Sequence, residues 1–169
     1  MIDQLNVCLP AGPGRLARMC RVLGESGVQI HGVMVASNTD FAIVRLVVDR
    51  PQATCEMLCN LGYDASTCEV AALRVDNVPG GLAVLLDRLH SSDLTVAYAY
   101  SCSVNGGTVD IVRVQGEPVE LKLRGSGLTL VEARGCTPST RIRRAPRGGR
   151  RRHAARTVAK KQPKKGAAA

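Results

Sequence analysis

The sequence has 169 residues, of which 45% are hydrophobic, so we expect one or two small domains, each with an apolar core. Its net charge of +9 comes from residues 137–169, which contain 12 Lys and Arg and no acidic residue. Residues 1–136 contain 11 Lys and Arg and all 14 Asp and Glu, a net charge of −3. One Phe, three Tyr and no Trp exclude a sheet that reads RNA by stacking bases on aromatic side chains.

The seven cysteines argue against secretion. Their number is odd, and several occupy positions of small apolar residues in the predicted helices and strands. This usage favours a reducing compartment over a disulfide framework. No apolar run approaches the ~18–20 residues of a membrane-spanning helix. We therefore expect a soluble, cytoplasmic protein without a membrane partner.

Residues 1–69 are predicted to form a βαββαβ unit. Apolar and other residues alternate over 5–9, which predicts a strand with one buried face. A Pro-Gly turn and apolar residues at i, i+3, i+4 and i+7 predict a helix over 14–25. The remaining elements are strands at 28–36, 41–48 and 63–69 and a helix at 52–61. The 41–48 strand is apolar on both faces apart from Arg45, which indicates that its second face is also partly covered.

Residues 70–136 are predicted to repeat this order. A motif recurs after 66 residues, as Pro13-Gly14-Arg15-Leu16-Ala17 and Pro79-Gly80-Gly81-Leu82-Ala83, and the apolar helix pattern that follows it also recurs. Ile111–Val114 matches Ile43–Leu46 at an offset of 68, so the intervening loop has gained two residues. At 119–123 the pattern fits a strand or a short helix, and we predict a helix from the repeat symmetry. Self-similarity at this period indicates a duplicated domain.

Each repeat is marginal on its own, because a domain of about 60 residues buries only about 60% of its unfolded surface. We therefore expect the two repeats to pair side by side. An α+β fold with one sheet of about eight strands, with helices mainly on one face, would satisfy the strand edges and share a core. Association into a homo-oligomer is also expected.

Residues 137–169 are predicted to be a disordered basic tail. Ile142 and Val158 are their only aliphatic residues larger than alanine, so the segment cannot bury enough surface to fold. As a polycation it would bind nucleic acid without sequence preference through counterion release. The alternative is a solubilising extension.

The residues form no catalytic or metal-binding pattern. No spacing links any of the three histidines to a nucleophile and an acid, and Ser126 lacks the full Gly-x-Ser-x-Gly turn. Cys55 and Cys59 lie one helical turn apart, but without a nearby His we favour packing or exposed thiols over metal binding. We therefore expect a protein that is not an enzyme and needs no metal or other cofactor.

The Pro-Gly turns before two of the helices are the remaining candidates for a site. A helix N-terminus offers unpaired backbone N–H groups and a partial positive charge, and glycine lets a ligand carboxylate come close. Gly14 and Gly80 are placed for this role. The alternative is that Pro-Gly only shapes the turn into the helix.

These motifs resemble the ACT domain, the small amino-acid-sensing module of biosynthetic enzymes. The resemblance covers about residues 1–134, and four stretches carry it: Pro13–Ala17, Gly27–Ile30, Asn38–Leu46 and Asn77–Leu82. The likeness is strongest to short bacterial proteins made of two ACT domains. It implies ferredoxin-like repeats, paired side by side, and amino-acid binding where the first loop of one copy meets the facing strand of its partner.

The resemblance also implies which residues bind the ligand. In the family, a polar residue two positions before the proline often holds the ligand; Asn77 matches this position, whereas Ala11 departs from it. The polar position that opens the second strand matches Gln29 and Thr95. The predicted ligand-binding set is Gly14, Arg15, Leu16, Gln29, Asn77, Gly80, Gly81, Leu82 and Thr95.

Three functions are compatible with these observations. The first is a regulatory protein that binds a free amino acid between its two copies and responds by a change in shape or partner. The second is a nucleic-acid-associated protein in which residues 137–169 bind the nucleic acid and the ACT pair is a dimerising platform. The third is an enzyme or enzyme subunit with an active site that the sequence does not reveal.

Overall fold

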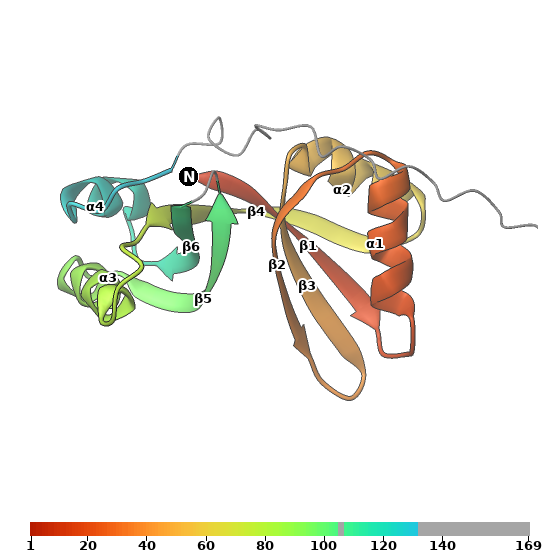
Figure 1. Ribbon diagram of the computed structural model, residues 1–169, viewed down its shortest axis with the longest axis horizontal. Helices are drawn as coiled ribbons and strands as arrows, with labels where there is room; N and C mark the ends of the chain where they lie inside the picture. Colours follow the sequence, from red (N-terminus) through yellow and green to blue (C-terminus); the bar gives the residue numbers. More distant parts are fainter. Residues whose placement is uncertain (105–106, 132–169) are drawn as a thin grey trace, which may run out of the picture.

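The computed structural model describes residues 1–104 and 107–131 (Figure 1). Its elements are β1 (Ile2–Pro10), α1 (Arg15–Glu25), β2 (Ile30–Ser37), β3 (Phe41–Val48), α2 (Pro51–Asn60), β4 (Asp64–Arg74), α3 (Gly81–Ser91), β5 (Thr95–Val104), β6 (Gly107–Gln115) and α4 (Val119–Gly125). This order confirms the α+β fold with two βαββαβ-like repeats, and α4 confirms the helix predicted from repeat symmetry. The predicted tail, residues 137–169, lies outside the described residues.

The strands form one antiparallel sheet in the order β2-β3-β1-β4-β6-β5. Within the described residues this is six strands, so the expectation of about eight was wrong. One strand is lost because the last strand of the first repeat and the first strand of the second are continuous in β4. The other is reduced to a single bridge between Leu73 and Leu130. The predicted boundary between residues 69 and 70 therefore falls inside a strand.

β4 belongs to both repeats. Its first part pairs with β1 as far as the Ile2 and Val70 pair, and its last part pairs with β6 from Ala71 onward. Beyond the end of β1, the Val131 N–H donates to the Ala72 carbonyl at 2.7 Å. The first repeat thus comprises β1 to β4, and the second comprises β4 to α4.

All four helices lie on one face of this sheet, as expected. Alternate residues of a strand share a face, so Ala65, Ala71 and Leu73 of β4 point to the same side. Ala65 packs against the core under α1 and α2, whereas Ala71 and Leu73 pack in the core under α3 and α4. The two helix pairs stand at opposite ends of the molecule (Figure 1).

The sheet curls, so that the helix-free side of the first repeat packs against the helix-free side of the second. Val47 of β3 and Ile111 of β6 share a third core with Tyr98 and Tyr100 of β5. The guanidinium of Arg45 lies 4.0 Å from the centre of the Tyr98 ring. The prediction that the second face of the 41–48 strand is covered is therefore confirmed, and the second repeat covers it.

Candidate functional site

Both Pro-Gly turns lead into helices, as predicted. Gly14 and Gly80 precede α1 and α3 in the left-handed conformation, with φ of 74° and 87°, which glycine adopts without steric cost. The first helical bonds run from the Arg18 N–H to the Gly14 carbonyl at 2.9 Å and from the Val84 N–H to the Gly80 carbonyl at 3.1 Å. The first N–H groups of each helix lie ahead of these bonds and have no partner within the helix.

A hollow of about 770 Å³ lies beside the start of α1. It is formed by the end of β1, the turn into α1, the start of β3 and the turn before β4. All thirteen lining residues belong to the first repeat: Cys8, Leu9, Pro10, Pro13, Gly14, Arg15, Arg18, Asp40, Phe41, Leu61, Gly62, Tyr63 and Asp64. A smaller hollow of about 240 Å³ shares Leu9, Pro10, Arg15 and Phe41 with it, and Leu16 is among the residues that line only the smaller one. The structure therefore brings Gly14, Arg15 and Leu16 to one region.

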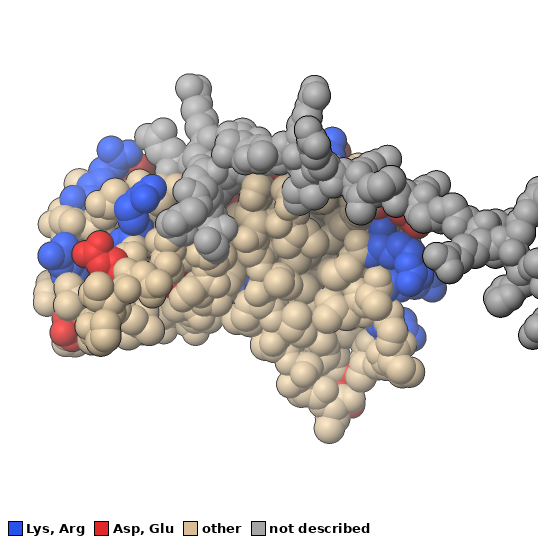
Figure 2. Space-filling view, in the orientation of Figure 1, with Lys and Arg blue, Asp and Glu red and all other residues tan. Residues whose placement is uncertain are grey.

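The large hollow carries charges of both signs. Arg15 and Arg18 line it from α1, Asp40 lines it from the residue before β3, and Asp64 lines it from the start of β4. Within residues 1–104 and 107–131, none of these four groups forms an ion pair. On the face that Figure 2 shows, cationic side chains gather over α1 and near α4, at the two ends of the molecule. The hollow is thus an open site with two cations and two anions available to a ligand.

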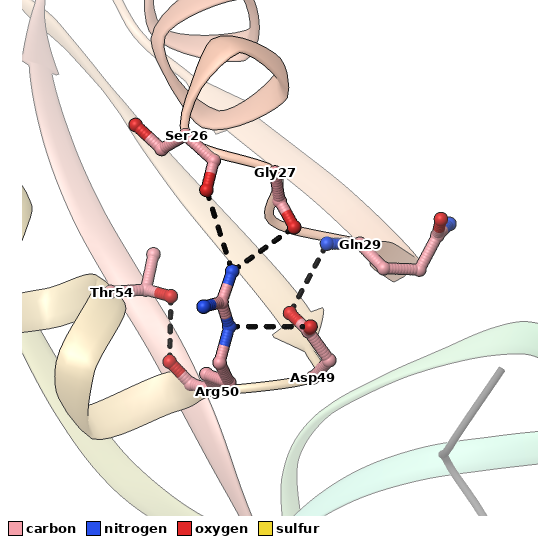
Figure 3. Close-up of polar contacts among 6 residues, drawn as sticks. All are labelled: Ser26, Gly27, Gln29, Asp49, Arg50 and Thr54. Carbon is pink, nitrogen blue, oxygen red and sulfur yellow. Dashed lines mark hydrogen bonds and ion pairs between the residues drawn. The ribbon is translucent and has the colours of Figure 1, made fainter.

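Gln29 does not reach this hollow. It follows the other end of α1, whose 11 residues span about 16 Å. Its backbone N–H donates to Oδ1 of Asp49 at 3.1 Å, and its side-chain amide turns away from that contact (Figure 3). In the same view Arg50 donates to the Gly27 carbonyl at 3.0 Å, which fixes the turn from α1 into β2. In the structure Gln29 is part of a turn that holds α1, β2 and α2 together.

The predicted residues of the second repeat are also apart from the hollow. Thr95 is exposed at the start of β5, where it pairs with Gln115. Asn77 is exposed in the loop before α3, and Gly80, Gly81 and Leu82 form the start of that helix. α1 and α3 lie at opposite ends of the molecule (Figure 1), so one small ligand cannot contact both helix starts within one chain.

The family model for the ACT domain pair matches residues 1–120. The chain belongs to the ACT domain family. Protein BT0572 from Bacteroides thetaiotaomicron is similar in structure, with 25% sequence identity, a TM-score of 0.72 and coverage of 79% of this chain and 94% of that one. The ligand-free regulatory subunit of aspartate kinase from Thermus thermophilus shares the fold at 16% identity, a TM-score of 0.52 and coverage of 72% and 88%. A search of the curated proteins found no significant match.

The ACT pair is a regulatory rather than a catalytic type of domain, and this agrees with the coarse function expected from the sequence. In the described part of the chain, no helix has the length and hydropathy of a membrane span. The same residues contain no cluster of three or more His, Cys, Asp or Glu suited to a metal ion.

Sequence reasoning placed only Gly14 and Arg15 among the thirteen lining residues of the ACT pair's hollow, and four of the missed residues matter for its chemistry. Asp40 and Phe41 stand within a stretch that carried the family resemblance, so that stretch contained a signal for them. Arg18 follows Arg15 by three positions, which places both on one side of a helix. Asp64 gave no signal, because only the pairing of Cys8 with Asp64 brings the turn before β4 beside α1.

A second polar group of this ACT pair was also missed, between the two repeats. Gln4 of β1 is fully buried, and its Nε2 donates to the Tyr98 hydroxyl at 2.8 Å and to Oδ1 of Asn6 at 2.6 Å. Burial, and to a lesser extent Cys68, raises the pKa of Tyr98. Burial raises the pKa of Tyr100 more strongly. These groups are satisfied by one another, which suits a structural joint better than a ligand site.

Proposed function

We propose that this ACT pair is a cytoplasmic regulatory protein, not an enzyme, that binds a free amino acid in the hollow beside α1. The observation that supports the proposal is the arrangement of charge there. A free amino acid carries a carboxylate and an ammonium group on the same α-carbon, so the two opposite charges lie close together. The hollow is lined by two Arg and two Asp residues whose charged groups form no ion pair within residues 1–104 and 107–131.

The ligand carboxylate is assigned to Arg15 and Arg18. An Arg guanidinium binds a carboxylate through paired N–H donors, and such charge-assisted bonds are stronger than neutral ones. The start of α1 adds a partial positive charge on the same side. The left-handed Gly14 leaves the approach open, since a Cβ built there would meet no atom within 4 Å.

The ligand ammonium is assigned to Asp40 and Asp64. Asp40 immediately precedes β3, and its backbone is held by Oδ1 of Asn38, which accepts from the Asp40 N–H at 2.9 Å. Asp64 opens β4 and is fixed by its pairing with Cys8 of β1. A ligand bridging Arg15 to these carboxylates would tie α1 to two strands. This link is how occupancy of the hollow would change the shape of the protein or its affinity for a partner.

A thermal-shift screen of the twenty amino acids against the full chain tests this proposal. A ligand present at 100 times its Kd stabilises the folded state by about 2.7 kcal/mol, which is readily detected. We expect at least one amino acid to raise the melting temperature and Asp40→Asn to reduce the shift. If no amino acid raises the melting temperature, the proposed function is wrong.

The basic segment supports a second candidate function, association with nucleic acid. Residues 137–169 contain 12 Lys and Arg, whereas the preceding residues have a net charge of −3. Binding driven by these cations would weaken steeply as salt rises, because it depends on counterion release. Salt-sensitive retention on DNA by the full chain, and not by residues 1–136, would support this function. If residues 1–136 were retained on DNA as strongly as the full chain, the basic segment would not be the cause of the retention.

A further inference from the structure

We infer that this ACT pair binds one amino acid per chain, in the first repeat only, and that the ligand is a neutral amino acid with an apolar side chain. The inference rests on the proposed function and specifies its site, stoichiometry and ligand class. It follows from a comparison of the two repeats at positions that the offset of 66 residues makes equivalent.

The two cations of the hollow have no counterpart in the second repeat. Gly81 stands where the first repeat has Arg15, and Val84 stands where it has Arg18. Val84 is 54% exposed, so the second helix start presents apolar surface where the first presents guanidinium groups. The second helix start therefore lacks an Arg at both positions that bring a guanidinium group to the hollow of the first repeat, and Arg is the side chain suited to paired binding of a carboxylate.

The backbone before α3 also excludes an arginine at position 81, the equivalent of Arg15. A Cβ on Gly81 would lie 2.3 Å from the carbonyl oxygen of Asp76, so only glycine fits. The Gly81 N–H donates to the Val78 carbonyl at 3.0 Å, and the Val78 N–H donates to the Asp76 carbonyl at 2.8 Å. This turn folds tightly onto the helix start and uses one of its N–H groups. By contrast, Gly12 in the first loop lies against the Arg15 side chain and leaves it room.

The Asp40 and Phe41 side chains likewise have no counterpart in the second repeat. The strand pairing keeps the offset of 66 through the second hairpin, because Leu5 pairs with Leu46 as Ala71 pairs with Val112, and Val33 pairs with Leu46 as Ala99 pairs with Val112. The predicted gain of two residues in the loop was therefore wrong, and Gly106 and Gly107 stand where the first repeat has Asp40 and Phe41. Phe41 is 41% exposed in the first repeat, whereas Gly107 has no side chain to offer a ligand. Both the carboxylate and the exposed apolar contact are therefore specific to the first repeat.

The ligand class follows from the lining of the hollow. Its two cations and two carboxylates balance, so a ligand with no net charge is favoured over one with an added charge. Phe41 and Leu61, the latter 57% exposed, present apolar surface to the same space. An apolar ligand side chain can cover this surface and gain from its removal from water.

Isothermal titration of the full chain with L-leucine, L-phenylalanine, L-glutamate and L-lysine tests the inference. We expect the first two to bind with one site per chain and the charged pair to bind more weakly. Arg18→Val, which installs the residue of the second repeat, should weaken binding by about tenfold or more, the effect of losing one hydrogen bond to a charged group. Val84→Ser, at the equivalent exposed position, should leave the affinity unchanged within about twofold.

Circular dichroism and the melting temperature of each ligand-free variant establish that it is folded. Two sites per chain, unchanged affinity in a folded Arg18→Val variant, loss of binding in a folded Val84→Ser variant, or tighter binding of the charged probes would each overturn the inference and leave amino-acid binding intact. Absence of binding by all four probes and in the screen of twenty amino acids would overturn the proposed function as well.

Discussion

Tyr100 of β5 donates its hydroxyl hydrogen to Oε1 of Gln4 on β1, with 3.0 Å between the two oxygen atoms. The two residues belong to different repeats, and the Gln4 side chain is fully buried. The two repeats of the ACT pair are therefore joined by a specific polar contact as well as by the shared strand β4 and the apolar core between them.

Replacement of Tyr100 by Phe should destabilise the protein. The change keeps the ring and removes the hydroxyl, so the buried Gln4 oxygen loses its donor. We expect the free energy of unfolding to fall by about 1–3 kcal/mol, the cost of a buried unsatisfied polar group. Urea unfolding followed by circular dichroism measures it.

The double variant with Gln4→Leu provides the control for this contact. Because Gln4→Leu removes the group that Tyr100→Phe leaves unsatisfied, the combined cost should be smaller than the sum of the two single costs. Strict additivity of the two changes would show that the hydrogen bond does not couple the repeats.

The stability of the ACT pair should fall at alkaline pH. Burial is the main cause that raises the pKa values of Tyr98 and Tyr100 above their usual value of 10.0. In the folded state both phenols therefore stay protonated at a pH where the unfolded chain releases its phenolic protons. This contribution is fully present below about pH 10 and is lost as the pH rises above it.

Urea unfolding at a series of pH values between about 8 and 11, with tyrosinate absorbance as a second readout, tests this dependence. The Tyr100→Phe variant is the control, since it lacks the more strongly shifted phenol and should show a shallower loss. A loss of stability that is as steep in Tyr100→Phe as in the parent protein would contradict the assignment to this residue.

A side chain at Gly32 should force the two edge strands apart. A Cβ there would lie 2.9 Å from the Cys102 Cβ on β5, which is closer than real Cβ contacts. We expect Gly32→Val to lower the free energy of unfolding by about 1–3 kcal/mol, as overpacking does elsewhere. Thermal and urea unfolding measure the effect.

Gly24→Ala is a matched control, because we expect this change to raise the free energy of unfolding rather than to lower it. Gly24 lies within α1, and an added Cβ would meet no atom within 4 Å. Alanine favours the helix by about 0.5–1 kcal/mol over glycine. If Gly32→Val were as well tolerated as Gly24→Ala, the close approach of β2 to β5 would be wrong.

Loss of the Arg50 side chain should weaken the turn at the end of α1. Arg50 donates to the Gly27 carbonyl and its Nε lies 3.4 Å from Oδ2 of Asp49 (Figure 3). Because the guanidinium is exposed, we expect Arg50→Met to cost only about 0.5–1.5 kcal/mol. Amide hydrogen exchange should show faster exchange at Val28 while the core strands keep their protection. If amide exchange in β1 became faster to the same extent, the substitution would instead have destabilised the whole protein.

Local patterns in the sequence determined most of the elements of this protein. The alternation over residues 5–9, the apolar spacing after Gly14 and the turn residues that bound each segment act through neighbouring residues, so they can be read without the fold. The repeat then supplied α4, where the local pattern was ambiguous. The apolar residues on both faces of β3 also form a local pattern, and this pattern indicated that the second face of the strand is covered.

Tertiary structure alone decided how these elements meet. Whether residues 63–75 form two strands or the single strand β4 depends on which neighbours pair with them, and the curl that brings Tyr100 to Gln4 depends on packing along the whole sheet. The hollow beside α1 has the same origin. Asp64 lines the same hollow as Arg15 and Arg18 because β1 pairs with β4 in the register that sets Cys8 opposite Asp64. Register and curvature arise from many long-range contacts at once, and no local pattern of residues encodes them.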